Sequence, residues 1–231
     1  MSENALPAFE IADPSEVVAA IDAVSAGEAI FADCDGTLWA GDVGDDYVRL
    51  AAARPELFPR STAAERDVET YLRRVDHDYE GACLQSALLS QGVDRVAVFA
   101  ALRSTLAAEL RPRRWLLDAM LQAADRGVKL WAVSASGRIP VDVGLDLLGV
   151  ADRFGVIAVE VDDRGPIAPW SIGFGKVHAC RAAGLAAPAV AVGDSVWDGP
   201  MLADARHGFR LPKPKDDGRF DASAADLRAG R

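Results

Sequence analysis

The sequence predicts an α/β fold, a parallel sheet with helices on both faces, interrupted by an all-helical insertion. Short apolar runs at residues 28–32, 128–133 and 189–192 have the length of buried strands, and each ends in a polar turn. Helical patterns separate the later runs, and alternation of strands with helices is typical of a parallel sheet. Between residues 41 and 125 strand patterns are missing, which predicts the insertion.

The first predicted elements are a helix and the strand that follows it. Residues 1–14 show no clear pattern, whereas residues 14–24 place apolar side chains at helical spacing before Gly27. The apolar run at residues 28–32 then reads as a fully buried strand, because it is short and bounded by turn residues on both sides.

Two carboxylates follow this first strand directly. Side chains of an extended chain alternate between faces, so Asp33 and Asp35 can leave the strand end on one side while Cys34 faces the other way. The close approach of two carboxylates is costly without a cation. The alternative is that the Asp-Gly pair at Asp35 simply makes a turn. Cys34 itself is expected to be a buried, inert thiol.

The insertion is rich in Ala, Leu, Arg and Glu with amphipathic spacing. A glycine-rich, acidic stretch at residues 41–46 leads into it. We expect about four helices there, by their amphipathic spacing, at residues 47–53, 63–75, 79–90 and 94–110.

After the insertion the alternation of helices and strands resumes. We expect helices at residues 113–126, 141–148 and 175–183, a further strand at 154–161 and a turn at 162–166. The segment from residue 213 onward is weakly patterned, as a short surface helix or a loose tail would be. We therefore divide the chain into an α/β core of residues 1–40 and 126–231 and a helical cap of residues 41–125.

Composition excludes some classes of partner. The chain has 231 residues, 50% hydrophobic and 26% charged, with a net charge of −10. Nucleic acids and anionic membranes attract Lys and Arg, so neither is an expected partner. No apolar window approaches the ~20 residues of a membrane span, and the N-terminus lacks a basic segment before an apolar run. The three cysteines are far apart, which favours a reducing cytoplasm over a disulfide framework or zinc site. The oligomeric state is left open.

Polar side chains follow all three of the strongest apolar runs. Asp33 and Asp35 follow the first, Ser134 the second, and Asp194 and Asp198 the third. Ligands of open parallel sheets bind beyond the carboxyl ends of the strands, so these groups can converge on one crevice.

Each of these residues, taken alone, has an ordinary structural interpretation. Asp194 and Asp198 suit the start and first turn of a helix. Ser134 suits a turn, and Lys176 suits a solvated surface position.

Four segments together resemble, in order, the motifs of the haloacid dehalogenase superfamily of phosphatases. The segments are Asp33-Cys34-Asp35-Gly36-Thr37-Leu38, Val133-Ser134-Ala135-Ser136, Gly175-Lys176 and Gly193-Asp194-Ser195-Val196-Trp197-Asp198. The resemblance implies a Rossmann-like core, with the insertion as the cap that the phosphoserine-phosphatase-like branch carries at this place.

The resemblance also implies roles for the motif residues. Asp33 would be the nucleophile that forms an aspartyl-phosphate, and Asp35 would protonate the leaving alkoxide and then activate water. Thr37 and Ser134, with backbone amides such as that of Ala135, would bind the phosphoryl oxygens, which Lys176 would help to neutralise.

The cofactor implied by the resemblance is Mg²⁺, a hard ion that prefers oxygen ligands. Asp33, the backbone carbonyl of Asp35 and Asp194 would bind the ion, and Asp198 would hold one of its water ligands.

The substrate implied is a small phosphomonoester. In the phosphoserine-phosphatase-like branch an acidic residue shortly after the first motif contacts the substrate's amino group, and Asp42 occupies that place. Gln85 stands where the branch has an arginine for the substrate carboxylate, and Trp197 replaces an asparagine of the fourth motif. Asp42 leads us to expect an amino-alcohol or amino-acid phosphate as substrate, and Gln85 argues against phosphoserine itself. Alternatively, Asp42 caps a helix or a hinge.

Other functions remain open on the same residues. A dehalogenase would use the same nucleophile but would need neither Asp35 as an acid nor Mg²⁺. A phosphotransferase would differ only in its acceptor, and a non-catalytic ligand-binding module would lack the nucleophile or a metal carboxylate. Asp33, Asp35 and Asp194 are all present, which favours the phosphatase.

Overall fold

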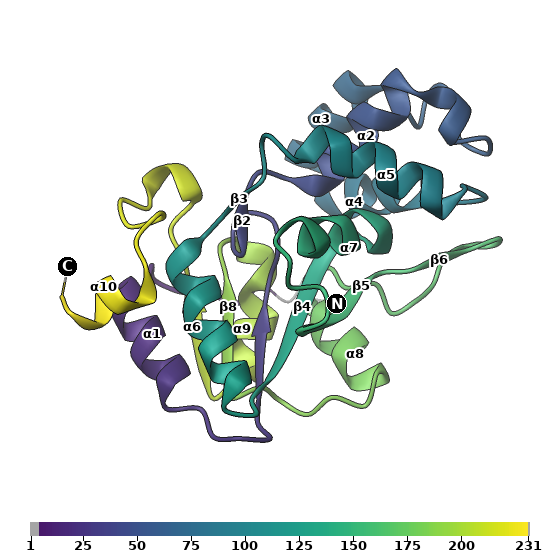
Figure 1. The fold of residues 1–231 in the computed structure, drawn as a ribbon. Helices are drawn as coiled ribbons and strands as arrows, with labels where there is room; N and C mark the ends of the chain where they lie inside the picture. The colour runs from purple at the N-terminus through teal and green to yellow at the C-terminus, as the bar shows by residue number, and fades with distance from the viewer. Residues whose placement is uncertain (1–4, 231) are drawn as a thin grey trace.

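The structure, a computed structural model, describes residues 5–230 and centres on one parallel sheet (Figure 1). Its strand order is β5-β4-β1-β8-β9, and every neighbouring pair is parallel. The strands are β1 (Ala29–Ala32), β4 (Lys129–Gly137), β5 (Phe154–Val159), β8 (Val190–Gly193) and β9 (His207–Arg210). The predicted α/β class is confirmed. The chain before residue 5 and residue 231 lie outside the described residues.

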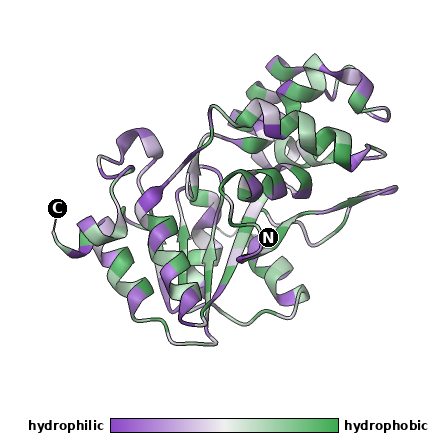
Figure 2. Cartoon of the chain, in the orientation of Figure 1, coloured by the Kyte–Doolittle hydropathy of each residue, from purple (hydrophilic) through white to green (hydrophobic). Residues whose placement is uncertain are grey.

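Helices cover both faces of the sheet. On one face are α1 (Pro14–Asp22), α6 (Arg114–Asp125), α7 (Arg138–Leu147) and α10 (Ala224–Arg228); on the other are α8 (Phe174–Ala182) and α9 (Gly199–Asp204). Alternation along β1 explains the two layers, because Ile30 packs into the first face and Phe31 into the second. Helix α1 carries both hydrophobic and hydrophilic segments (Figure 2), as expected for a helix with one buried face.

The insertion is all-helical, as predicted. It contains α2 (Val43–Ala53), the short 3-10 helix η1 (Pro55–Leu57), α3 (Val68–His77), α4 (Tyr79–Leu88) and α5 (Arg95–Leu106). Each α-helix begins after an aspartate whose carboxylate accepts a backbone N–H of the first turn, namely Asp42, Asp67, Asp78 and Asp94. These N-caps satisfy orphan donors and fix where the helices start.

Two adjacent strands connect the insertion to the sheet. The strands β2 (Trp39–Ala40) and β3 (Arg111–Pro112) pair antiparallel, so the chain enters and leaves the insertion side by side (Figure 1). Helix α6, which follows β3, packs against α1 and α10 beside the sheet. We therefore propose that the cap ends at Pro112, earlier than the boundary at residue 125 that the sequence suggests.

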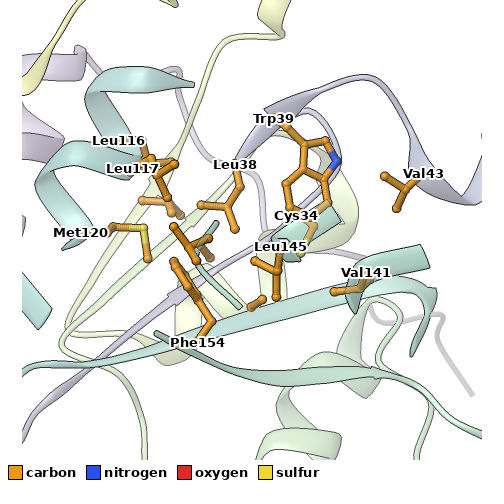
Figure 3. Close-up of a cluster of buried hydrophobic side chains, with 14 of the residues drawn as sticks. Cys34, Leu38, Trp39, Val43, Leu116, Leu117, Met120, Val141, Leu145 and Phe154 are labelled. Carbon is orange, nitrogen blue, oxygen red and sulfur yellow. The ribbon is translucent and has the colours of Figure 1, made fainter. Parts of the chain in front are cut away.

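The insertion and the sheet share one hydrophobic cluster. Figure 3 shows Trp39 and Val43, at the entrance to the insertion, together with Val141 and Leu145 of α7. Helix α7 contacts both α2 and α5. Helix α7 therefore packs directly against the helices of the insertion.

The remaining elements are a hairpin and the C-terminal segment. The predicted turn at residues 162–166 is a hairpin of β6 (Val161–Asp162) and β7 (Gly165–Pro166). The C-terminal segment contains the 3-10 helix η3 (Pro214–Asp216) before α10, and it buries Asp217, Phe220 and Leu227. Of the two alternatives for this segment, the short helix is the one found, and it packs against the core. Across residues 5–230, no helix combines the length and apolarity that crossing a membrane requires.

Arg113 ties the C-terminal segment to the turn after β1. Its guanidinium is fully buried and pairs with the Asp217 carboxylate. It also donates to the carbonyl oxygens of Thr37 at 2.9 Å, Gly36 at 2.8 Å and Pro212 at 2.9 Å. One side chain thus satisfies acceptors from two distant segments, the turn after β1 and the C-terminal segment.

We expect Arg113→Leu to lower the free energy of unfolding by about 3–5 kcal/mol, because it leaves a buried carboxylate without its partner. Urea denaturation measures the change. The matched control is Arg114→Leu, at a neighbouring side chain that is 66% exposed, and it should stay within about 0.5 kcal/mol of the parent. Equal, small effects of both substitutions would contradict this role of Arg113.

Candidate active site

Three predicted carboxylates meet at the carboxyl edge of the sheet. Asp33 follows β1, and Asp194 and Asp198 follow the adjacent strand β8. One carboxylate oxygen of each lies within 4.8 Å of the others, and all three residues are buried. The parallel pairing of β1 with β8 produces this proximity, since both strands end at the same edge.

Lys176 of α8 lies beneath this acidic group. Its Nζ donates to Asp33 Oδ1 at 2.7 Å, to Asp198 Oδ1 at 2.6 Å and to the carbonyl oxygen of Val133 at 2.8 Å. The side chain is 1% exposed. Its three acceptors match the three protons of the ammonium group. The surface alternative for Lys176 is wrong in this structure.

The electrostatics of the group follow from its burial. Burial, followed by the Asp198 carboxylate, raises the pKa of Asp33 to about 8, although the Lys176 ammonium acts in the opposite direction. Burial also raises the pKa of Asp194. For Lys176, burial by itself lowers the pKa, but the carboxylates of Asp198 and Asp33 outweigh it and hold the pKa above its ordinary value. Burial and the neighbouring carboxylates thus disfavour the ionised form of Asp33, and Lys176 offsets this effect only in part.

The turn after β1 packs directly against Asp194. A Cβ at Gly36 would lie 2.0 Å from Asp194 Oδ2, and Gly36 has a φ of 76°, so this position requires glycine. Thr37 Oγ1 donates to Asp33 Oδ2 at 3.0 Å. Thr37 therefore orients the Asp33 carboxylate in this structure, while the sequence suggested a contact with phosphoryl oxygens.

Asp198 holds the loop that carries Asp194. Its Oδ2 accepts from the backbone N–H of Asp194 at 3.1 Å, the backbone N–H of Ser195 at 2.9 Å and the Ser195 hydroxyl at 2.8 Å. Its Oδ1 accepts from Lys176. Both oxygens are thus engaged within the protein, which favours an indirect role for Asp198 beside a metal.

Asp194 has a partner that the sequence analysis missed. Lys213 Nζ donates to Asp194 Oδ2 at 2.8 Å. Lys213 follows β9, the edge strand, and β9 was not predicted because His207–Arg210 contains one large apolar residue. Ligands of parallel sheets bind beyond the carboxyl ends of the strands, and applying this rule to β9 would have pointed to Lys213.

The donor set fits a divalent cation such as Mg²⁺. Carboxylate oxygens are hard ligands, and Mg²⁺ prefers them. The raised pKa values of Asp33 and Asp194 reflect burial, with a further rise from neighbouring carboxylates that a cation would offset. The carboxylate of Asp35 does not belong to the acidic group of the described residues, which leaves its backbone carbonyl as the candidate ligand.

The Asp35 carboxylate is held by three donors instead. Its Oδ1 accepts from Trp39 Nε1 and from the backbone N–H of Val43, both at 2.8 Å, and its Oδ2 accepts from Ser136 Oγ at 2.7 Å. Burial raises the pKa of Asp35, and these hydrogen bonds act against the rise. A carboxyl so held, at the wall of a cavity, suits acid–base chemistry.

The cavity beside these groups has a volume of about 370 Å³. It is lined by residues of the core, the turns and the insertion: Asp33, Asp35, Gly36, Gly41, Asp42, Val75, Tyr79, Ser134, Ala135, Ser136, Asp194, Ser195, Trp197, Lys213 and Pro214. Predicted residues Asp33, Asp35, Asp42, Ser134, Ala135 and Asp194 thus share one wall. Thr37, Lys176 and Asp198 lie buried behind it.

Asp42 lies in this wall and also caps α2, where its Oδ1 accepts from the backbone N–H of Asp45 at 2.9 Å. Burial, followed by the Asp35 carboxylate, raises its pKa well above the ordinary value. Gln85, in contrast, lies outside the wall and donates to the carbonyl oxygen of Glu65 at 3.0 Å. The insertion therefore presents an acid and no matching base to the cavity.

Comparisons with known proteins identify the family of this chain and proteins of similar fold. The model of the haloacid dehalogenase-like hydrolases matches residues 28–206. A haloacid dehalogenase family hydrolase from Salmonella enterica subsp. enterica serovar Typhi has a similar fold, with a TM-score of 0.55 and 17% identity, covering 84% of this chain and 65% of that chain. A protein of unknown function from Bordetella pertussis Tohama I also has a TM-score of 0.55, at 16% identity, covering 78% of this chain and 87% of that chain.

A phosphoserine phosphatase, solved as an analogue of its phospho-aspartyl intermediate, has a TM-score of 0.47 and 19% identity, covering 83% of this chain and 90% of that chain. No curated protein sequence matches this chain. The family match covers the motif segments from Asp33 to Asp198 and confirms both the resemblance and the prediction of an enzyme. The chain belongs to the haloacid dehalogenase-like hydrolases.

Proposed function

We propose that this protein hydrolyses small phosphomonoesters through an aspartyl-phosphate formed on Asp33, with Mg²⁺ as cofactor. The observation that carries the proposal is the meeting of Asp33, Lys176 and Asp194 beside one cavity that Asp35 also lines. A nucleophile, a fixed positive charge and a held carboxyl are what phosphoryl transfer to a carboxylate requires.

In the proposed first step, an Asp33 carboxylate oxygen forms a bond to phosphorus as the bond between phosphorus and the ester oxygen breaks. Asp35 gives its carboxyl proton to the departing alkoxide. Lys176 holds Asp33 Oδ1, and Thr37 holds Oδ2, so the nucleophile is oriented before substrate arrives. Backbone amides near Ser134 and Ala135, in the cavity wall, would bind phosphoryl oxygens.

In the second step, Asp35 accepts a proton from a water molecule that attacks the phosphorus of the aspartyl-phosphate, which releases phosphate and restores Asp33. The carboxylates of Asp33 and Asp194 and the carbonyl oxygen of Asp35 would hold Mg²⁺, with Asp198 supporting it indirectly. When bound, the ion supplies positive charge that offsets repulsion between phosphate and these carboxylates.

The cavity wall favours a substrate with an amino group. Of the lining residues that the insertion supplies, Asp42 is the one with a charged side chain, and Val75 and Tyr79 are beside it. An ammonium group on the leaving alcohol would meet the Asp42 carboxylate, whereas a carboxylate there would be repelled. We therefore propose an amino-alcohol phosphate as substrate.

We further propose that the enzyme works in the cytoplasm. Its three cysteines are free and buried, as is usual for proteins of a reducing compartment.

A dehalogenase on the same fold is less well supported. It would need neither an acid at the position of Asp35 nor a buried acidic group suited to binding a metal. Both are built into this site by several hydrogen bonds each. A phosphotransferase differs only in the acceptor and is distinguished by whether phosphate is released to water.

We expect Asp33→Asn to abolish Mg²⁺-dependent release of inorganic phosphate from a panel of phosphomonoesters, because an amide cannot form the covalent intermediate. Free phosphate is measured colorimetrically beside recovery of the alcohol. The control Asp152→Asn changes an exposed aspartate and should leave the rate unchanged. Undiminished phosphate release by Asp33→Asn would exclude this mechanism.

We expect Asp42→Asn to lower kcat/KM for phosphoethanolamine and phosphocholine by about tenfold, since removing one charge partner costs about 1–2 kcal/mol. The rate for glycerol 3-phosphate should change little. Asparagine caps helices as well as aspartate does, so α2 should keep its start. A uniform change across the three substrates would end the proposed role of Asp42.

A further inference from the structure

Trp39 belongs to the connection between core and insertion and contacts the Asp35 carboxylate. Its side chain is fully buried, and its indole N–H donates to Asp35 Oδ1 at 2.8 Å. Its backbone carbonyl accepts from the N–H of Gly36 at 2.9 Å, which closes the turn between the two residues. The same short segment therefore fixes both the backbone and the side chain of Asp35.

The three donors to Asp35 are distributed unevenly between its oxygens. Oδ1 accepts from Trp39 Nε1 and the Val43 N–H, which occupies both of its lone pairs. Oδ2 accepts only from Ser136 Oγ among the described residues. A transferable proton on this carboxyl therefore belongs on Oδ2, and Trp39 is part of the reason.

The indole ring of Trp39 packs against Gly144 of α7. A Cβ added at Gly144 of α7 would lie 2.9 Å from Trp39 Cη2 and 3.0 Å from Cζ2. Real Cβ atoms do not approach ring carbons so closely, so glycine at residue 144 allows the ring its position. A contact on α7 thus fixes the ring whose N–H reaches Asp35.

We propose that Trp39, supported by Gly144, is a positioning residue that aims the Asp35 carboxyl at the oxygen of the leaving group. This inference rests on the proposed phosphatase function. It goes beyond that function by assigning the orientation of the acid to a side chain outside the four motif segments and to a helix that does not line the cavity. Trp39 touches no reacting atom and acts through Asp35.

The proposal has a consequence that a purely structural role of Trp39 does not share. Alkyl phosphates release a strongly basic alkoxide and depend on protonation, whereas p-nitrophenyl phosphate releases a weakly basic phenolate and does not. Misplacing the acid should therefore slow alkyl phosphates selectively, by about tenfold or more, since acid catalysis contributes about 10²–10⁴-fold. General loss of folded enzyme would slow both classes alike.

The experiment compares kcat/KM for p-nitrophenyl phosphate with that for phosphoethanolamine and glycerol 3-phosphate. Trp39→Phe removes the indole donor and keeps a ring in the core, and Gly144→Ala moves the ring while Trp39 itself is kept. Thermal denaturation of each variant reports its fold.

Two controls make the same changes elsewhere. Trp115→Phe removes another buried indole, whose N–H points at Asp217. Gly155→Ala places a Cβ 2.5 Å from the ring of Trp131, away from the cavity wall.

We expect the ratio of alkyl to aryl kcat/KM to fall about tenfold in Trp39→Phe and Gly144→Ala and to stay constant in both controls. A constant ratio in the two test variants, or an equal fall in the controls, would overturn the role of Trp39. If Trp39→Phe does not fold, the Gly144→Ala ratio alone decides. If the parent protein hydrolyses none of the three esters, the phosphatase function itself is wrong.

Discussion

The hydrogen bonds of the Lys176 ammonium are the constraint on which the rest of the site depends. A buried cation with acceptors on Asp33, Asp198 and Val133 joins the loops after β1 and β8 and the middle of β4 to the start of α8. Without it, the buried carboxylates of Asp33 and Asp198 would lose the ammonium group with which they pair, and a buried carboxylate without a partner is strongly destabilising. The ion pairs therefore belong to the fold as much as to the chemistry, and they fix where a phosphoryl group would meet the protein.

A second set of contacts fixes the loop that carries Asp35. The turn after β1 is closed by Trp39, packed against Asp194 at Gly36 and held from the far side by Arg113. Through Arg113, the C-terminal segment that carries Lys213 also reaches this turn. Residues from the connection, the core and the C-terminal segment thus hold the loop after β1, which keeps Asp33 and Asp35 in distinct environments. Separate environments allow two carboxyl groups to take separate tasks.

Much of this arrangement follows from local sequence patterns. The apolar runs predict the three central strands. Because parallel strands end at the same edge of the sheet, the residues that follow these strands, Asp33, Ser134 and Asp194, are predicted to share that edge. What could not be predicted depends on long-range pairing. Strand β9 is polar, the Arg113–Asp217 pair joins residues 104 positions apart, and the hydrogen bond from Trp39 to Asp35 needs α7 behind the ring. None of these leaves a periodic signal, because each is fixed by packing between distant segments.

The central claim is that the buried carboxylates around Lys176 form one binding site for a divalent cation. Isothermal titration calorimetry of the metal-free protein with MgCl₂ tests it without any assumption about substrate. The account predicts saturable binding of one Mg²⁺ ion per chain, lost in Asp194→Asn and retained in Asp163→Asn, which changes an exposed aspartate. Absence of binding at millimolar Mg²⁺, or equal binding by both variants, would contradict it.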